Sequence, residues 1–391
     1  MSEIQLPLLI RASGRDRPRL TSELLGLLAR AGAELEDMEQ LVVRERLTLD
    51  VLVRLESASD ALLRDILYWG FRNEMKVDFE RVEATSQRAS RRRHAVTVLG
   101  RPLTPIALSA VADAISDTGG NIDRIVRLAT QPVTAYDLVV IVDDPDAMRT
   151  ALVSVAREHH IDVAVQVNGL ERRGKRRVGG DVGLTVFADE VIELLADEAG
   201  CRAEVEAVTT AAMAGELDFE TSLRERVRRL AGLEVAALDR AAARIRLTPG
   251  ARTFVSTLQR MGFSVAVVSG GFTAFTDRLK ADLGLDHAYA NTLEIVDGRL
   301  TGEVVGPVVD RARKAELLRE IAAVEGILPS QAVAVGDGAN DLDMLAASGL
   351  GIAFNAKPAV RARAHTTVSV PRLDVILFML GVRGAEVDHV D

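Results

Sequence analysis

The chain has 391 residues, enough for roughly two or three domains, and its 48% hydrophobic and 27% charged content is ordinary for a globular protein. A formal net charge of −9 argues against general nucleic-acid binding, which needs clustered Lys and Arg, and the single cysteine, Cys201, excludes an internal disulfide. The sequence shows neither a signal-peptide pattern nor an apolar run of about 18 residues, so we expect a cytoplasmic protein with neither nucleic acid nor membrane as a partner.

The first half of the chain carries one pattern of elements twice. In the first unit, residues 1–85, apolar spacing predicts strands at 6–11, 34–43, 47–55 and 76–82 and helices at 20–31 and 58–72. In the second unit, residues 93–168, it predicts strands at 94–99, 122–128, 135–142 and 161–167 and helices at 105–118 and 145–159. The order strand–helix–strand–strand–helix–strand is the ferredoxin-like plan, an α+β fold, and its repetition is itself a structural signal.

A third region, residues 175–385, alternates apolar strands with amphipathic helices and is predicted to be an α/β domain. Within it, the stretch from about 196 to 248 is rich in Ala, Arg and Glu and has a helical pattern. We therefore predict a helical segment inserted between two strands of the domain's sheet.

One strand of this domain ends in a glycine-rich loop. Val265–Val268 is a β-branched run, and Ser269–Gly271 follows it just ahead of a helical pattern marked by Phe275 and Leu279. Glycines let the backbone approach a ligand closely, and backbone N–H groups at the start of a helix attract an anion. The loop is therefore a candidate phosphate cradle, although Ser-Gly-Gly alone is more often a simple turn.

A run of charged residues opens a later amphipathic helix. Asp310–Lys314 stands ahead of Leu317, Leu318 and Ile321, which have the spacing of a buried side. One cation of this run is a candidate to point into a cleft. A charged and solvated first turn is the simpler alternative.

Acidic residues follow another apolar run. Ala332–Val335 predicts a short buried strand, and Asp337, Asn340 and Asp341 come directly after it. The next helix is expected to bury one side, formed by Leu342, Leu345 and Ala346. Ligands of α/β folds bind at the carboxyl ends of strands, and carboxylates this close repel each other unless a cation such as Mg²⁺ lies between them. An acidic surface turn is the simpler alternative.

These segments, in this order, resemble the phosphoserine phosphatase family of the haloacid dehalogenase superfamily. The resemblance covers Ala188 to about Val382 and rests on Glu190–Glu193, Met213–Phe219, Ser222–Val227, Ser269–Phe272, Leu300–Gly302, Lys314, Gly336–Asp341 and Gly351–Pro358. It implies a Rossmann-like core with a helical cap at about 196–248 that closes over the substrate. Met213 and Phe219 are then candidates for the substrate side of that cap.

The resemblance also implies roles for matching positions. It places a substrate-binding set around phosphoserine: Glu190, Arg226, Ser269, Gly270, Lys314 and Asn340. Within that set, Ser269 and Lys314 hold the phosphoryl group, whereas Glu190 and Arg226 recognise the amino and carboxylate groups. It assigns Mg²⁺ to Asp181, Asp337 and Asp341.

The two ferredoxin-like units resemble tandem ACT domains, which are amino-acid-sensing modules. Gly14–Pro18 is similar to their first turn, although Arg19 stands where a Gly is common. The resemblance implies serine or another amino acid as an effector and a homodimer. A pair of packing modules without any ligand is the alternative.

The chain departs from the family at the nucleophile. The family carries the motif Asp-x-Asp-x-Thr at the end of the first strand; its first Asp attacks phosphorus and its second protonates the leaving oxygen. Counting back from Glu190 aligns this motif with Asp181–Thr185, so Asp181 is the predicted nucleophile and Gly183 occupies the acid/base position. The preceding strand would be Arg176–Gly180, a poor β run.

A second register takes Leu184–Phe187 as the first strand, because its composition suits a strand far better. The nucleophile loop is then absent, and Asp189 is the one carboxylate near the old nucleophile position. Residue count favours the first register, strand composition favours the second, and the acid/base residue is missing in both. Its absence costs roughly 10² to 10⁴ in rate.

The resemblance therefore predicts a Mg²⁺-dependent phosphatase of serine biosynthesis that hydrolyses O-phospho-L-serine to L-serine and phosphate through an aspartyl-phosphate intermediate. Amino acids would regulate it at the ACT-like units. The alternative is a catalytically impaired homologue that acts as an amino-acid- or phosphoserine-binding regulatory protein. Action on another phosphomonoester is a third option, against which Glu190 and Arg226 argue.

Overall fold

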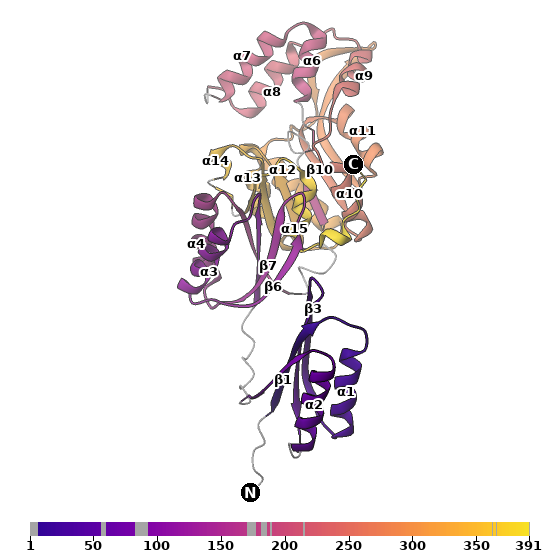
Figure 1. The fold of residues 1–391 in the computed structure, drawn as a ribbon. Coiled ribbons are helices and arrows are strands. Elements are labelled where there is room, and N and C mark those ends of the chain that lie inside the picture. Colours follow the sequence, from indigo (N-terminus) through magenta and orange to yellow (C-terminus); the bar gives the residue numbers. More distant parts are fainter. Residues whose placement is uncertain are drawn as a thin grey trace. The chain divides into compact units, whose positions relative to one another are not determined.

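The computed structural model describes residues 7–55, 60–82, 93–169, 177–180, 186–187, 190–213, 216–361, 363–364 and 366–390. The chain divides into two compact units, Met1–Ser90 and Arg91–Asp391, and Figure 1 traces the elements of each. No helix in the described part of the chain is both long and apolar enough to cross a membrane.

The first unit is a four-stranded antiparallel sheet with the order β2-β3-β1-β4 and two helices. Its elements are β1 (Leu8–Arg15), α1 (Leu20–Arg30), β2 (Glu34–Val43), β3 (Arg46–Arg54), α2 (Asp60–Arg72) and β4 (Lys76–Arg81). Alternate residues of β3 and one side of each helix form the core, because a strand buries every second side chain and a helix every third or fourth. The structure confirms the predicted ferredoxin-like plan.

Arg19 lies directly before α1 in the left-handed conformation, with φ 78°. A side chain there places Cβ too close to the backbone, whereas Gly adopts the same conformation without that cost. This explains physically why a Gly is common at the position and why Arg19 is an exception.

The second unit begins with another ferredoxin-like layer, whose sheet has the order β6-β7-β5-β8. Its elements are β5 (Arg93–Gly100), α3 (Pro105–Asp117), β6 (Asn121–Ala129), β7 (Thr134–Ile141), α4 (Pro145–His159) and β8 (Asp162–Val167). Both helices begin with a proline behind a capping side chain: Thr104 accepts from the Ala107 N–H, and Asp144 accepts from the Ala147 N–H. The predicted repeat is confirmed.

The rest of the second unit is built on a seven-stranded sheet with the order β12-β11-β10-β9-β13-β14-β15. The strands are β9 (Arg177–Gly180), β10 (Val265–Phe272), β11 (His287–Val296), β12 (Arg299–Val305), β13 (Ala332–Gly336), β14 (Leu350–Phe354) and β15 (Thr366–Val368). All neighbouring pairs are parallel except β11 and β12. The sheet confirms the predicted Rossmann-like core.

Helices cover both faces of this sheet. They are α10 (Ala251–Arg260), α11 (Thr273–Leu283), α12 (Arg311–Val324), α13 (Leu342–Ala347), α14 (Pro358–Arg361) and α15 (Ile376–Met379). Val265 and Val267 of β10 join one hydrophobic cluster, whereas the alternate residues Ala266 and Val268 join another together with Leu317 of α12. Near-continuous apolar runs such as β10 are expected in a parallel sheet that is buried on both sides.

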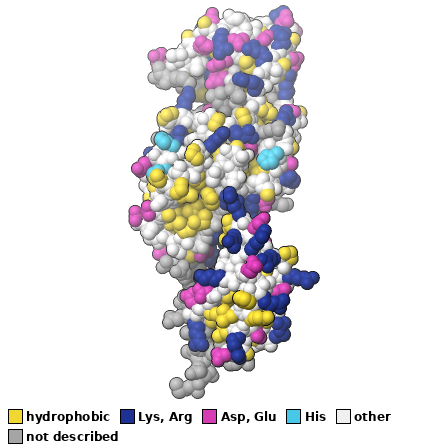
Figure 2. All heavy atoms as spheres, in the orientation of Figure 1, with side chains coloured by type: hydrophobic (Ala, Val, Ile, Leu, Met, Phe, Trp, Pro, Cys, Tyr) yellow, Lys and Arg dark blue, Asp and Glu magenta, His cyan; other side chains and the backbone are white. Residues whose placement is uncertain are grey.

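Four helices follow one another between β9 and α10 and group at one end of the second unit (Figure 1). They are α6 (Val191–Ala199), α7 (Arg202–Met213), α8 (Phe219–Arg228) and α9 (Val235–Arg244). Figure 2 shows Lys and Arg side chains mixed with Asp and Glu over this group. The predicted cap, about 196–248, overlaps these helices, and its limits stay a prediction.

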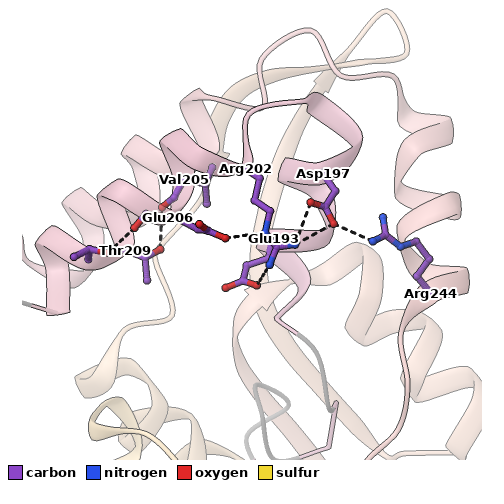
Figure 3. A network of polar contacts seen from close by, with 8 residues as sticks. Glu193, Asp197, Arg202, Val205, Glu206, Thr209 and Arg244 are labelled. Atoms are coloured by element: carbon purple, nitrogen blue, oxygen red, sulfur yellow. Dashed lines mark hydrogen bonds and ion pairs between the residues drawn. The ribbon is translucent and has the colours of Figure 1, made fainter.

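An ion-pair network holds α6, α7 and α9 of this group together (Figure 3). Arg202 donates to Glu193 at 2.8 Å, to Asp197 at 3.0 Å and to Glu206 at 2.7 Å, and Arg244 donates to Asp197 at 2.9 Å. These contacts tie α6 to α7 and α9. A network in which charges share several partners holds geometry better than an isolated surface pair.

The second ferredoxin-like layer contacts the α/β sheet through β8. The carboxylate of Asp162 accepts from the Ser369 N–H at 2.8 Å, the Ser369 hydroxyl at 2.9 Å and the Thr367 hydroxyl at 3.3 Å. Gln166 Nε2 donates to the Met379 carbonyl at 2.7 Å. Burial raises the pKa of Asp162, which the hydrogen bonds from Ser369 oppose. The two layers therefore share a buried polar junction beside β15.

Candidate active site

The candidate site lies at the carboxyl edge of the seven-stranded sheet. β9 is the central strand, parallel to β10 on one side and to β13 on the other. Because parallel strands end at the same edge, this topology brings the loop after Val268 and the loop after Gly336 to the edge at which β9 also ends. Asp181, Gly183 and Asp189 lie outside the described residues.

The place of β9 supports the first nucleophile register. Val178 pairs with Val265 and with Val333, so the supposedly poor segment is a strand with neighbours on both sides. That strand pairing overrides weak local propensity. Phe187, from the favoured run of the second register, forms an isolated antiparallel bridge with Leu247 instead of a strand of the sheet. The expectation that 176–180 makes a poor strand was therefore wrong, whereas the role of Asp181 stays a prediction.

Ser269 and Gly270 form a fixed loop within the end of β10. The buried Ser269 hydroxyl accepts from the Gly271 N–H at 2.9 Å. Asn291 of β11 donates to the Gly270 carbonyl at 2.8 Å, and its own carbonyl accepts from the Val309 N–H at 2.8 Å. Asn291 is not predictable from the sequence, because a single Asn in a strand gives no local sign of a long-range contact. Its hydrogen bonds hold the loop in one conformation.

Lys314 and Asp341 form a fully buried ion pair. Both side chains are 0% exposed, and Lys314 Nζ lies 2.7 Å from Asp341 Oδ1. The other carboxylate oxygen accepts from the Gly338 N–H at 2.9 Å. Asp310 caps α12 by accepting from the Arg313 N–H at 2.7 Å, and this places Lys314 on the first turn. The simpler alternative of a solvated first turn is thus wrong for Lys314.

Close packing fixes the loop after β13. A Cβ added to Gly336 would lie 2.5 Å from Asp341 Cβ, so only Gly fits there. Asn340 is half-buried and its side chain lies against Gly338. In α13, Leu342 and Leu345 are buried as predicted, but Ala346 is exposed and Met344 is buried in its place. A short 3-10 turn, Ala339–Asp341, precedes α13 and shifts the helical phase.

Asp337 and Asp341 are the two described residues of the predicted metal site. Asp337 is half-buried directly after β13, and both oxygens of Asp341 accept hydrogen bonds. The carboxylate of Asp341 also binds Lys314, and its direct binding to the metal stays a prediction. Within the described residues no group of three His, Cys, Asp or Glu side chains is close enough to form a metal site. Mg²⁺ needs one or two carboxylates besides water and phosphate, which Asp337 and Asp181 can supply.

Glu190 and Arg226 lie close enough for their charges to interact. Glu190 precedes α6, and its side chain does not cap that helix. Arg226 belongs to α8, and its Nε donates to the Ser222 carbonyl at 3.3 Å. Burial lowers the pKa of Arg226, and the negative charge of Glu190 counters that effect. One anion and one cation thus stand together, as binding an amino-acid head group requires.

The cap reaches the phosphate loop through Phe219. A Cβ added to Gly270 would lie 3.1 Å from Phe219 Cζ, so the ring packs over the bare backbone of the loop. Gly270 therefore permits this approach of cap and loop. Met213 ends α7, and its side chain lies outside the described residues.

Models of two known families match the chain. A haloacid dehalogenase-like hydrolase model matches residues 181–346, and ACT domain models match 7–80 and 92–166. The chain is therefore a haloacid dehalogenase-like hydrolase with two ACT domains ahead of the hydrolase domain.

Similar proteins of known function identify the family within the haloacid dehalogenase-like hydrolases. The chain is 51% identical over 388 residues to a phosphoserine phosphatase of Streptomyces coelicolor, covering 98% of this chain and 94% of the relative. It is 47% identical over 392 residues to one of Mycobacterium tuberculosis, covering 99% and 96%. A solved phospho-aspartyl intermediate analogue of a phosphoserine phosphatase is 43% identical, with a TM-score of 0.50, covering 52% of this chain and 98% of that one. The chain belongs to the phosphoserine phosphatase family.

Proposed function

We propose that this chain hydrolyses O-phospho-L-serine to L-serine and phosphate, through an aspartyl-phosphate intermediate and as a step of serine biosynthesis. The observation that carries the proposal is the buried Lys314–Asp341 pair at the sheet edge where β9 and β10 also end. Phosphoryl transfer is catalysed mainly by positioning and charge stabilisation. A fixed ammonium group and the donors of the Ser269–Gly271 loop supply both.

The reaction has two displacements. A carboxylate oxygen of Asp181 attacks phosphorus, and the bond from phosphorus to the serine oxygen breaks, so that Asp181 carries the phosphoryl group. Water then attacks the aspartyl phosphate, and phosphate leaves as the carboxylate is restored. The Lys314 ammonium offsets charge on the phosphoryl oxygens in both steps. Ser269 Oγ accepts from Gly271 and keeps its own proton for donation to the phosphoryl group.

Mg²⁺ held by Asp337 and Asp181 would neutralise phosphate charge, which is the chemistry that such an ion supplies. Asp341 contributes indirectly: its carboxylate fixes the positions of the Lys314 ammonium group and of the Gly338 N–H. The Ser269 loop, Lys314 and Asp337 together make a site for a dianionic phosphate.

Gly183 makes the first displacement slow. The serine oxygen leaves as an alkoxide, and its proton comes from water because no acid stands at position 183. We expect turnover to be lower by roughly 10² to 10⁴ than in an enzyme with that acid. This same residue favours the second candidate function, a binding protein that senses phosphoserine without turning it over.

Substrate choice rests on Glu190 and Arg226. Arg226 grips the substrate carboxylate with its planar fork, and Glu190 accepts from the substrate ammonium group. In the substrate-free protein these two residues offset each other's charge.

We also propose an amino-acid effector site in the first ACT unit. A hollow of about 460 Å³ lies at the turn before α1 and is lined by Asp16, Arg17, Pro18, Arg19, Leu20, Thr21, Ser22 and Gln40. Serine at 100 times its dissociation constant would stabilise the unit by roughly 2.7 kcal/mol. A shift of the melting temperature with serine or a related amino acid tests this site, and the absence of a shift with every amino acid contradicts it.

We further propose that the protein is cytoplasmic and forms a homodimer. Light scattering, which measures molar mass, tests the dimer.

The main test is release of inorganic phosphate from O-phospho-L-serine in the presence of Mg²⁺. We expect saturable release that a chelator abolishes and that O-phosphoethanolamine, which lacks the carboxylate, does not match. Saturable binding of phosphoserine with no release would favour the binding protein, and no binding at all would overturn both functions.

A further inference from the structure

One buried hydroxyl in the cap has no hydrogen-bond partner. Ser222 of α8 is 2% exposed, and among the described residues nothing bonds to its Oγ. A Ser inside a helix commonly donates back to the carbonyl four residues earlier, but this one does not. A hydroxyl in this state has lost water without replacement, which is unfavourable, and such groups in native proteins often mark a binding site. Ala would fill the same place without that cost.

Helix geometry directs this hydroxyl toward the substrate site. Phe219, Ser222 and Arg226 stand at i, i+3 and i+7 of α8, so they share one face of the helix. Phe219 packs over Gly270 of the phosphate loop. The side chain of Arg226 extends toward the N-terminal end of α8, where its Nε donates to the Ser222 carbonyl at 3.3 Å. Ser222 therefore lies between the residue that touches the phosphate loop and the residue assigned to the head group.

We infer that Ser222 Oγ donates a hydrogen bond to the carboxylate of the substrate, beside Arg226, and so adds to the selection of an amino-acid phosphate. A carboxylate has about four acceptor positions, and an Arg fork occupies two of them. The Ser222 hydroxyl carries one proton to give and has no other acceptor among the described residues. The inference rests on the proposed function, since it needs a substrate with a carboxylate.

The test compares Ser222→Ala with Arg226→Ala and with the unsubstituted chain. Calorimetry in a chelator measures binding of O-phospho-L-serine without turnover, and O-phosphoethanolamine serves as the matched probe that lacks the carboxylate. We expect Ser222→Ala to raise the dissociation constant of phosphoserine roughly tenfold, which corresponds to about 1.4 kcal/mol. Binding of phosphoethanolamine should change less than about twofold, because that ligand makes no bond to the hydroxyl.

The melting temperature of the free variant separates a binding role from a structural one. We expect Ser222→Ala to melt at the same or a higher temperature, because an unpaired buried hydroxyl is removed. A lower melting temperature would show that the hydroxyl has a partner in the free protein and would overturn the inference.

The outcomes for the two variants distinguish this inference from the proposed function. Weaker phosphoserine binding by Arg226→Ala with no change in Ser222→Ala overturns the role of Ser222 alone. Equal weakening of both ligands by Ser222→Ala also overturns it. Failure of the unsubstituted chain to bind phosphoserine both in a chelator and with Mg²⁺ overturns the proposed function together with this inference.

Discussion

Replacing Asp341 by Asn should destabilise the second unit strongly. The pair with Lys314 is 0% exposed on both sides and 2.7 Å long, so the substitution leaves an ammonium group buried without its anion. Removing one partner of such a pair costs about 3–5 kcal/mol, because the remaining charge keeps its desolvation penalty. The packing of Gly336 against Asp341 Cβ leaves little room for a compensating water. For a domain of this size the loss corresponds to a melting temperature lower by roughly 6–20 °C.

A matched control is Glu320→Gln in the same helix. Glu320 accepts two bonds from Arg313, at 2.6 and 3.1 Å, but it is half exposed, so its loss should cost less than about 1 kcal/mol. Urea unfolding followed by far-ultraviolet circular dichroism measures both variants. The only tryptophan, Trp69, lies in the core of the first unit, so its fluorescence reports on that unit and should stay unchanged. Equal losses of stability for Asp341→Asn and Glu320→Gln would show that burial of the Lys314–Asp341 pair adds no extra cost to breaking it.

Three further predictions follow from local features. Arg19→Gly should stabilise the first unit by up to about 1 kcal/mol in urea unfolding followed by Trp69, because it relieves the left-handed conformation; lower stability would contradict this. The pKa of Asp162 is raised in the fold from its ordinary 3.8, so the folded state binds more protons just above pH 3.8 and stability falls as pH rises through that window. Asp162→Asn should make the free energy of unfolding depend less on pH in that range. An unchanged dependence would show that other groups cause it. Asp337→Asn should weaken Mg²⁺ binding in calorimetry, and equal affinity for the two proteins would remove Asp337 from the metal site.

Local sequence signals predicted most elements of the ferredoxin-like units. The helix over Pro145–His159 was predicted to the residue, because Pro145 follows a capping Asp144 and His160 ends the helix in the left-handed conformation. A strand was predicted over residues 47–55, and β3 spans Arg46–Arg54 with every second side chain buried. Elements that stabilise themselves locally are readable in this way.

The geometry of the candidate site could not be predicted from the sequence, because it depends on contacts between residues far apart in the chain. β9 has weak strand composition and exists because β10 and β13 supply hydrogen bonds from both sides. Asn291 and the Lys314–Asp341 pair join residues far apart in the chain, so spacing alone could nominate Lys314 and Asp341 but could not pair them. The family resemblance predicted the roles of the site residues, and the structure shows their hydrogen-bond and ion-pair partners.

The proposed function depends on Asp181, which follows β9 in the sequence, as the nucleophile that cleaves phosphoserine. The most direct measurement compares initial rates of phosphate release from O-phospho-L-serine for the unsubstituted chain, Asp181→Asn and Gly183→Asp. We predict that Asp181→Asn abolishes release, whereas Gly183→Asp raises it by roughly 10² or more. The gain should be smaller on a nitrophenyl phosphate, because its nitrophenolate group leaves without needing a proton. Unchanged rates in both variants would contradict the account, because they would show that Asp181 is not the nucleophile.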